Sequence, residues 1–140
     1  MFLTDPDYSF VTDAATLDVI QQSDEATRQR AEECAIEEIS SYLRNRYDMV
    51  AAFSATGDDR NKLLVMMTCD VTLYHMIAWL PKRMGFEIRE TRYNSVIKTL
   101  VDVHNKLQMD LPLYTDPITG DTDTGNPVKY GSMKKNRNDW

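Results

Sequence analysis

Apolar residues recur at helical spacing in three stretches of the chain before Asp110. In the first, residues 23–47, one helix face carries an apolar stripe while charged residues occupy the other faces. The spacing predicts an amphipathic surface helix that begins at Ser23-Asp24-Glu25. Small residues within the stripe would let a neighbouring helix approach closely. The stripe consists of Ala31, Ala35, Ile39, Tyr42 and Leu43.

The second stretch, residues 59–80, is apolar on more than half of its circumference, which predicts the central helix of the fold. Pro81 should end this helix, because proline disfavours the α conformation in the residue before it and has no N–H. Gly85 interrupts the chain after this helix. The third stretch follows it and predicts a further helix. The predicted buried positions are Leu63, Leu64, Met66, Met67, Val71, Leu73, Tyr74, Ile77, Ala78 and Leu80 in the central helix, and Tyr93, Val96, Ile97, Leu100, Val103 and Leu107 in the last.

The remaining stretches before Asp110 carry weaker patterns. A short first helix is predicted around Leu17, with Thr12 or Thr16 as its cap. Residues 48–58 show no sustained period and predict a connection. No run predicts a β-strand. The fold class is therefore all-α: an antiparallel bundle of about four helices over residues 1–109, followed by a long extended C-terminal arm over residues 110–140.

The arm has few side chains that could form a core, yet its end is rich in cations and aromatics. Aromatic residues and arginine are enriched at binding hot spots, so the end of the arm is a predicted interaction segment. The alternative is a disordered solubilising end. We expect the arm from about Leu111 to be flexible in an isolated subunit and ordered on a neighbour, with its cations on an acidic face of Glu32, Glu33, Glu37 and Glu38. The predicted interaction residues are Tyr130, Lys134, Lys135, Arg137 and Trp140.

Composition narrows the function classes. The net charge of -6 argues against a protein that adheres to nucleic acid by bulk attraction. Neither a spanning helix nor a secretion signal is expected, so we predict a soluble, cytoplasmic chain. Cys34 and Cys69 fall among apolar helix positions, which predicts buried free thiols. Five methionines are predicted to fill the core and the helix ends: Met66, Met67, Met76, Met84 and Met109.

Asp70 is the one charge that interrupts the stripe of the central helix. A buried carboxylate needs a cation, and a two-point pair with Arg92, or failing that Arg89, would satisfy it best. The alternative role of catalytic acid or metal ligand would need a second carboxylate or histidine at a matching position. His75, five positions further on, lies across the helix, and His104 is isolated, so the ion pair is the preferred interpretation.

Other signals of chemistry are weak. Residues 116–126 resemble half of a calcium-binding loop, but the glycine comes one residue early and no glutamate closes the loop, so a flexible linker is the preferred interpretation. The sequence has no glycine-rich phosphate loop, zinc-type Cys and His spacing or nucleophile elbow. We therefore predict no catalytic, cofactor or metal site, and no enzyme.

The order of short motifs resembles that of the small head-tail connector (adaptor) proteins of tailed phages and Mu-like prophages, in particular those of Bacteroides-type bacteria. The resemblance spans nearly the whole chain, including the Asp116-Pro117 turn and the basic, aromatic-ended tail. The motifs are Met1-Phe2-Leu3-Thr4, Asp24-Glu25-Ala26-Thr27, Ser41-Tyr42-Leu43 through Arg46-Tyr47-Asp48, Asp70-Val71-Thr72-Leu73-Tyr74-His75-Met76-Ile77 and Arg89-Glu90-Thr91-Arg92-Tyr93.

The resemblance implies a structural virion protein of the neck, made in the bacterial host cytoplasm. Copies of such a protein, typically twelve, form a ring beneath the portal protein, meet the next tail or collar component, and extend a channel through which DNA passes without sequence-specific binding. No membrane or cofactor is implied. The family residues carry over as architecture only: Tyr42, Tyr47, Asp70, Arg92 and Tyr93. The chain departs from the pattern in its Met-rich central helix and in Pro81-Lys82-Arg83.

Two other function classes stay open from the sequence. One is a monomeric helical adaptor or regulatory binding module of a prophage, with a disordered tail. The other is a small DNA-binding protein that places the basic end of its arm on phosphates. The mass of the protein in solution separates a ring from a monomer, and a salt-dependent DNA affinity would indicate the second class.

Overall fold

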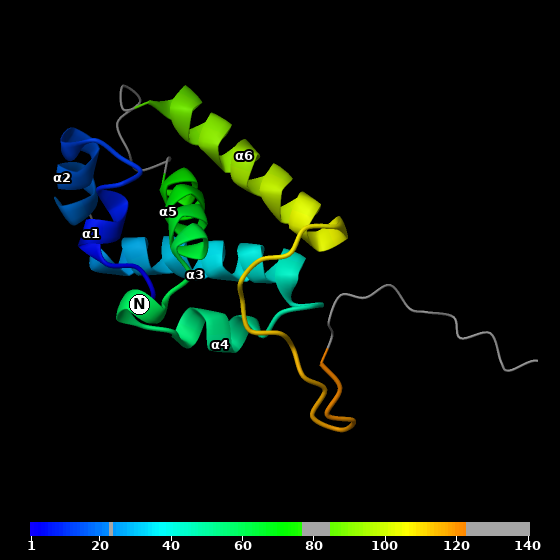
Figure 1. The fold of residues 1–140 in the computed structure, drawn as a ribbon. Helices are drawn as coiled ribbons and strands as arrows, with labels where there is room; N and C mark the ends of the chain where they lie inside the picture. Colours follow the sequence, from blue (N-terminus) through cyan, green and yellow to red (C-terminus); the bar gives the residue numbers. More distant parts are fainter. Residues whose placement is uncertain (23, 77–84, 123–140) are drawn as a thin grey trace, which may run out of the picture.

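Six α-helices and one 3-10 helix make up the described part of the computed structural model, which covers residues 1–22, 24–76 and 85–122 (Figure 1). Three of the helices are long and form the body: α3, α5 and α6. This confirms the all-α fold class. The elements are α1 (Asp5–Tyr8), α2 (Ala14–Gln22), α3 (Glu25–Leu43), α4 (Met49–Ser54), η1 (Gly57–Asp59), α5 (Lys62–His75) and α6 (Phe86–Asn105).

Helix α5 is the central element, as its apolar pattern predicted. It packs against both α3 and α6, and Figure 1 shows it crossing α3. Even its threonines Thr68 and Thr72 are fully buried. Ala31 and Ala35 of α3 are buried, and their small side chains allow the close approach of α5 that the sequence indicated. The core residues of the three long helices include Ile39, Leu43, Leu64, Met67, Val71, Leu73, Met76, Val96, Leu100 and Val103.

Three predicted core positions are instead exposed: Leu63, Met66 and Leu107. Leu63 and Met66 lie in the first part of α5, where the loop before the helix leaves one side open. Leu107 follows the end of α6, in the connection between this helix and the buried residue Leu111. An apolar side chain can remain in water without a large penalty, so the pattern alone overestimated the buried face.

The starts of the helices are set by local chemistry. The Asn61 side chain accepts a hydrogen bond from the Leu64 N–H, 3.0 Å away, and caps α5. Asp48 caps α4 in the same way through the Ala51 N–H at 2.9 Å. Gly85 precedes α6 with a φ of 77°, a left-handed conformation that glycine adopts without strain.

Two short helices were not predicted. The segment 48–58, expected to be a connection, contains α4 and the start of η1. Helix α1 is held by a capping box between Thr4 and Asp7. Helices of four and six residues are too short to establish a period, so their apolar residues look irregular in sequence. The predicted cap residue Thr16 lies inside α2 and donates to Asp13 Oδ1 at 2.5 Å.

The sequence predicted that the central helix extends over residues 59–80 and ends at Pro81. Among the described residues, α5 ends at His75, with Met76 as its C-cap. Ile77, Ala78, Leu80, Pro81 and Met84 lie outside the described residues.

The first residues of the predicted arm pack on the body, which corrects the expectation that the arm is free from Leu111 onward. Leu111 is buried, the Asp48 N–H donates to Pro112 O at 2.8 Å, and the Tyr114 N–H donates to Arg46 O at 2.9 Å. These bonds accompany an isolated antiparallel bridge between Tyr47 and Leu113. The backbone of this segment forms hydrogen bonds with the turn after α3. The prediction considered only the few apolar side chains of the segment, so it underestimated how firmly the segment is held.

Candidate interaction surface

Asp70 of α5 and Arg92 of α6 form a two-point ion pair. Arg92 Nε donates to Asp70 Oδ1 at 2.6 Å, and Arg92 Nη2 donates to Oδ2 at 3.1 Å. The Asp70 side chain is buried, whereas the Arg92 side chain is 35% exposed. The pair predicted from the sequence is therefore present in the fold, at the edge of the core, and it joins the two helices.

Arg89, the second candidate partner for Asp70, points to a different neighbour. It is buried, and its guanidinium donates to Val11 O at 2.9 Å and to Thr12 Oγ1 at 2.7 Å. Burial first, and then the charge of nearby Arg92, lower the pKa of Arg89. Arg89 therefore ties the loop between α1 and α2 to α6 and serves the fold.

A second polar cluster joins the three long helices. Glu38 of α3 accepts from the Tyr93 hydroxyl at 2.5 Å and lies 2.8 Å from His75 Nε2. Tyr93 also stacks on Tyr74, with ring centroids 3.9 Å apart. The hydrogen bond to Glu38 and burial raise the pKa of Tyr93 above its usual range. These contacts brace α3, α5 and α6.

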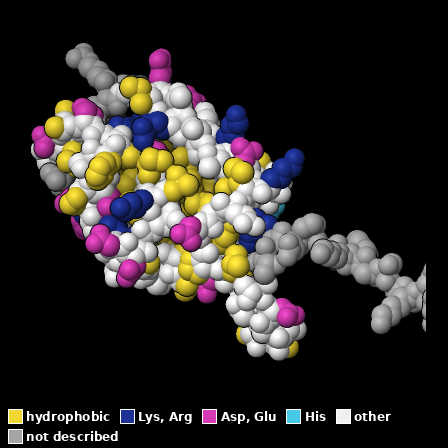
Figure 2. All heavy atoms as spheres, viewed as in Figure 1, with side chains coloured by type: hydrophobic (Ala, Val, Ile, Leu, Met, Phe, Trp, Pro, Cys, Tyr) yellow, Lys and Arg dark blue, Asp and Glu magenta, His cyan; other side chains and the backbone are white. Residues whose placement is uncertain are grey.

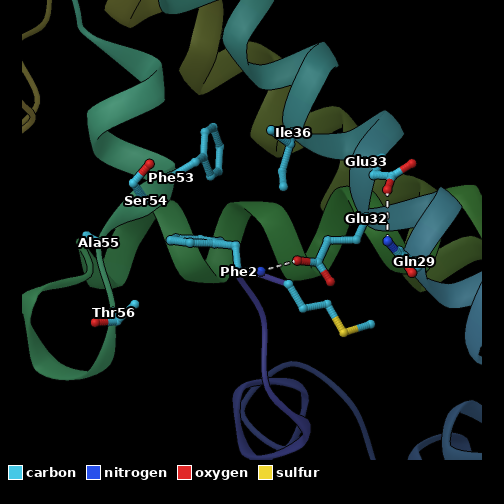
Figure 3. Close-up of a pocket in the computed structure, with 10 residues that line it drawn as sticks. Phe2, Gln29, Glu32, Glu33, Ile36, Phe53, Ser54, Ala55 and Thr56 are labelled. Carbon is cyan, nitrogen blue, oxygen red and sulfur yellow. Dashed lines mark hydrogen bonds between the residues drawn. The ribbon is translucent and has the colours of Figure 1, made fainter.

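The start of the chain is held by a buried glutamate on α3. Glu32 Oε1 accepts from the Phe2 N–H at 2.5 Å and from the Leu3 N–H at 3.0 Å. The Phe2 ring packs edge-on against Phe53 of α4, with centroids 4.9 Å apart. These contacts bring the first residues of the chain between α3 and α4 (Figure 3).

Arg60 reinforces this arrangement from the other side. It donates to Phe2 O at 2.8 Å, and it pairs with Asp7 at 2.7 and 3.1 Å. Its guanidinium carbon also lies 5.7 Å from the centroid of the Phe2 ring. Burial raises the pKa of Asp7, but the hydrogen bonds from Arg60 and Thr4 outweigh it, so the pKa lies below its usual range.

The acidic face expected on α3 is smaller than predicted. Glu33 and Glu37 are exposed, but Glu32 is buried against the first residues of the chain and Glu38 is engaged with His75 and Tyr93. Glu37 also pairs with Arg44. The sequence placed all four glutamates on the polar side of the helix and could not show which of them a distant segment covers.

Apolar side chains gather on one face of the molecule. Figure 2 shows them over α5, surrounded by acidic and basic side chains. Phe10 is 90% exposed. A hollow of about 510 Å³ is lined by the apolar residues Phe10, Val11, Val65 and Met66 and by the charged residues Asp7, Asp58, Arg60 and Lys62. Exposed apolar surface rimmed by charge is typical of a contact with another protein.

The two cysteines differ in their surroundings. Cys69 is buried, and burial raises the pKa of its thiol above the usual range. Cys34 is exposed, which corrects the expectation of two buried thiols. It lies on the exposed side of α3, about a quarter of a turn around the helix from its neighbour Ala35 in the buried stripe.

All five predicted interaction residues, from Tyr130 to Trp140, lie outside the described residues. Within the described ranges, no group of three or more His, Cys, Asp or Glu side chains is placed to hold a metal ion. No described helix is long and apolar enough to cross a membrane. Comparisons with protein-family models, with curated proteins and with solved structures found no match.

Proposed function

We propose that this chain is a subunit of a phage head-tail connector: a ring of copies that sits beneath the portal protein, meets the next tail or collar component, and surrounds the passing DNA. The resemblance of the sequence motifs supports this proposal. The structural observation that carries it is the position of the arm relative to the predicted acceptor surface on the same body.

The arm is anchored at one end of α3. The contacts of residues 112–114 with residues 46–48 place its base next to the C-terminal end of that helix. The exposed acidic residue Glu33 and the hollow beside it lie in the N-terminal half of the same helix. Figure 1 shows the two ends of α3 on opposite sides of the body.

The base of the arm and the acidic hollow are two different surfaces of the body, so an arm that reaches a neighbour's hollow makes a head-to-tail contact. Such a contact uses two different surfaces of each subunit, and repeating it generates a closed ring when the rotation closes. The eighteen residues beyond Thr122 can extend by about 3.3 Å each, roughly 60 Å in all, which is enough to cross a neighbouring subunit. The exposed apolar face over α5 offers a second area for contact with the portal.

The acidic body suits the proposed channel. Like charges on the protein and the DNA backbone prevent adhesion, so DNA can slide past the ring. The same acidity offers the cations of a neighbouring arm an attractive surface. The chain therefore needs no DNA-binding chemistry for this function.

The test is assembly with the portal protein of the same genome. We expect native mass spectrometry to show a multiple-copy complex with the portal, and particle imaging to place the chain in the neck. Deleting residues 128–140 should leave the far-ultraviolet circular dichroism unchanged and abolish incorporation into particles.

A matched set of substitutions distinguishes the effect of the arm's cations from the effect of a change in net charge. Lys134, Lys135 and Arg137 changed together to Ala should reduce incorporation, whereas the same loss of charge at the exposed body residues Arg30, Lys98 and Lys106 should have little effect. A chain that stays monomeric with the portal and is absent from virions would contradict the connector function. Tight DNA binding that weakens steeply with salt would favour a DNA-binding protein instead.

A further inference from the structure

A hollow of about 290 Å³ lies between α3, α4 and the first residues of the chain (Figure 3). Its polar wall comes from α3 and contains the carboxylates of Glu32 and Glu33. Its apolar side chains are those of Met1, Phe2, Ile36 and Phe53. The lining includes no Lys, Arg or His side chain, and its one cationic group is the terminal ammonium of Met1.

Glu32 is the unusual member of this lining. Only 2% of the residue is exposed, and its Oε1 already accepts the two N–H groups of Phe2 and Leu3. Its Oε2 is buried and has no hydrogen-bond partner among the described residues. Figure 3 shows the carboxylate projecting from α3 toward Phe2. A buried carboxylate oxygen without a partner is costly, so a cation or donor that reached it would bind favourably.

The neighbouring groups do not meet this need. The Gln29 amide, which also lines the hollow, donates to Glu33 Oε1 at 3.1 Å. Arg60 reaches the carbonyl of Phe2 and the carboxylate of Asp7 instead of Glu32. The Oε2 atom of Glu32 therefore has no donor among the described residues, and a ligand must displace the side chains that cover this oxygen to reach it.

The walls define the chemistry of that ligand. Two carboxylates on one side favour an ammonium or guanidinium group. Phe2, Ile36 and Phe53 on the other side suit a methylene stem, which long cationic side chains bury while the charged end finds a polar partner. An aromatic face near the cation adds a favourable cation–π contact. Lysine and arginine side chains meet all three conditions.

We infer that this hollow receives a Lys or Arg side chain from the C-terminal segment of a second copy of the chain. The inference rests on the proposed ring and names the acceptor site of its arm. Lys134, Lys135 and Arg137 supply the required cations. The eighteen residues beyond Thr122 extend by up to roughly 60 Å, at about 3.3 Å each, so a neighbour in the proposed head-to-tail ring can present its arm at this hollow.

The experiment measures binding of a fluorescent peptide, residues 128–140, to the full chain by anisotropy. Glu32→Gln is the decisive variant, because a glutamine oxygen still accepts from Phe2 and Leu3 while an NH₂ donor replaces the orphan oxygen. We expect Glu32→Gln to weaken peptide binding at least tenfold. Glu37→Gln, with the same charge change on the same helix but outside the hollow, should bind as the native chain does.

Two further measurements separate a loss of binding from a loss of stability. Ala55→Phe fills the hollow from its far side and should also weaken binding, and a peptide in which Lys134, Lys135 and Arg137 are Ala should not bind. Circular dichroism verifies that each variant is folded. If Glu32→Gln and Ala55→Phe bind the peptide as tightly as the native chain, the assignment of this hollow is wrong.

Isotope labelling distinguishes a second copy from the arm of the same chain. A mixture of ¹⁵N-labelled and unlabelled full chains, assembled with the portal and coupled with a carbodiimide, should yield amide-linked peptides that carry one isotope on each side. Links confined to single chains would overturn the second-copy assignment. If Glu32→Gln still incorporates into particles as the native chain does while the 128–140 deletion does not, the hollow is not the acceptor site of the arm, and the proposed connector function is retained.

Discussion

Arg92 on α6 holds Asp70 on α5 through two hydrogen bonds, of 2.6 and 3.1 Å. Arg89, one turn earlier on α6, instead ties the loop after α1 to the same helix. The two arginines thereby fix α6 against two different parts of the body. Asp70 provides a carboxylate for only one of them, so the Asp70–Arg92 pair is the stronger of the two attachments.

Asp70→Ala is expected to destabilise the protein by about 3 kcal/mol, which is the lower limit of the range of about 3 to 5 kcal/mol for breaking a buried ion pair. Arg92 is 35% exposed, so water can solvate part of the stranded cation. Chemical denaturation measures the change. Asp102→Ala, which removes an exposed carboxylate from α6, is the control and should change stability by less than about 0.5 kcal/mol. An unchanged denaturation midpoint for Asp70→Ala would show that the pair contributes nothing.

Glu32→Ala should release the start of the chain. It leaves the N–H groups of Phe2 and Leu3 without their acceptor, at a cost of about 1 to 3 kcal/mol for each buried donor that water does not reach. Hydrogen exchange at these two amides should accelerate strongly, while exchange in the middle of α5 should change less. Glu32→Gln retains an acceptor and should protect both amides. Equal protection in Glu32→Ala would contradict the role of this carboxylate.

The Asp7–Arg60 pair predicts a loss of stability in acid. The pKa of Asp7 in the folded protein lies below its usual range, because the hydrogen bonds from Arg60 and Thr4 outweigh burial. Asp7 binds its proton more weakly in the folded state than in the unfolded state. Its contribution is therefore complete above the unfolded pKa and disappears as the pH falls through the folded pKa.

Asp7→Asn tests this sign directly. At pH 7 the variant should be less stable than the native chain by about 1.5 to 3 kcal/mol, the range for a hydrogen bond to a charged group. The difference should shrink as the pH falls below about 4. Thermal melts between pH 7 and pH 3 provide the measurement, with Asp102→Asn as the exposed control. A difference that stays constant over this range would exclude a contribution from ionised Asp7.

The long helices could be predicted from the sequence because each buries a regular stripe. Ala31, Ala35 and Ile39 of α3 follow the period that packing against α5 requires, and all three are buried. Asp70 could be assigned a partner for a similar reason: a charge within an apolar stripe must be neutralised, and few cations lie on the neighbouring helix.

The hollow beside Glu32 could not be predicted in this way. Glu32 lies on the polar side of α3, and its burial depends on the first residues of the chain folding back some thirty positions away in sequence. Periodicity describes one helix and contains no information about which distant segment covers its polar face. The anchoring of residues 112–114 escaped prediction for the same reason, since it rests on backbone hydrogen bonds that any side chain permits.

The two cysteines should react at very different rates. Cys34 is exposed, whereas Cys69 is buried and its thiol pKa is raised by burial, so little thiolate forms there. We expect a thiol reagent at pH 8 to modify one cysteine in the native protein and both after unfolding. Peptide mapping should place the first modification at Cys34, and Cys34→Ser should abolish the rapid phase. Rapid modification of Cys69 in the folded chain would contradict the packing of α5.

The anchor of the arm offers the most direct link between fold and assembly. Leu111 is 9% exposed, whereas Leu113, two residues further on, is 37% exposed. Leu111→Ser should detach residues 111–115, because it removes the apolar contact beneath the hydrogen bonds of Asp48 and Tyr114. Amide exchange at Asp48 and Tyr114 should accelerate, with helical content unchanged. Leu113→Ser is the matched control.

A detached anchor adds residues 111–115 to the length of chain that separates the body from the predicted interaction residues. A longer flexible tether lowers the effective concentration of its end at a neighbouring site. Leu111→Ser should therefore incorporate into particles less efficiently than Leu113→Ser at equal protein concentration, and a higher concentration should restore part of the loss. If both variants incorporate equally while exchange at Asp48 and Tyr114 rises only in Leu111→Ser, the base of the arm has no part in assembly.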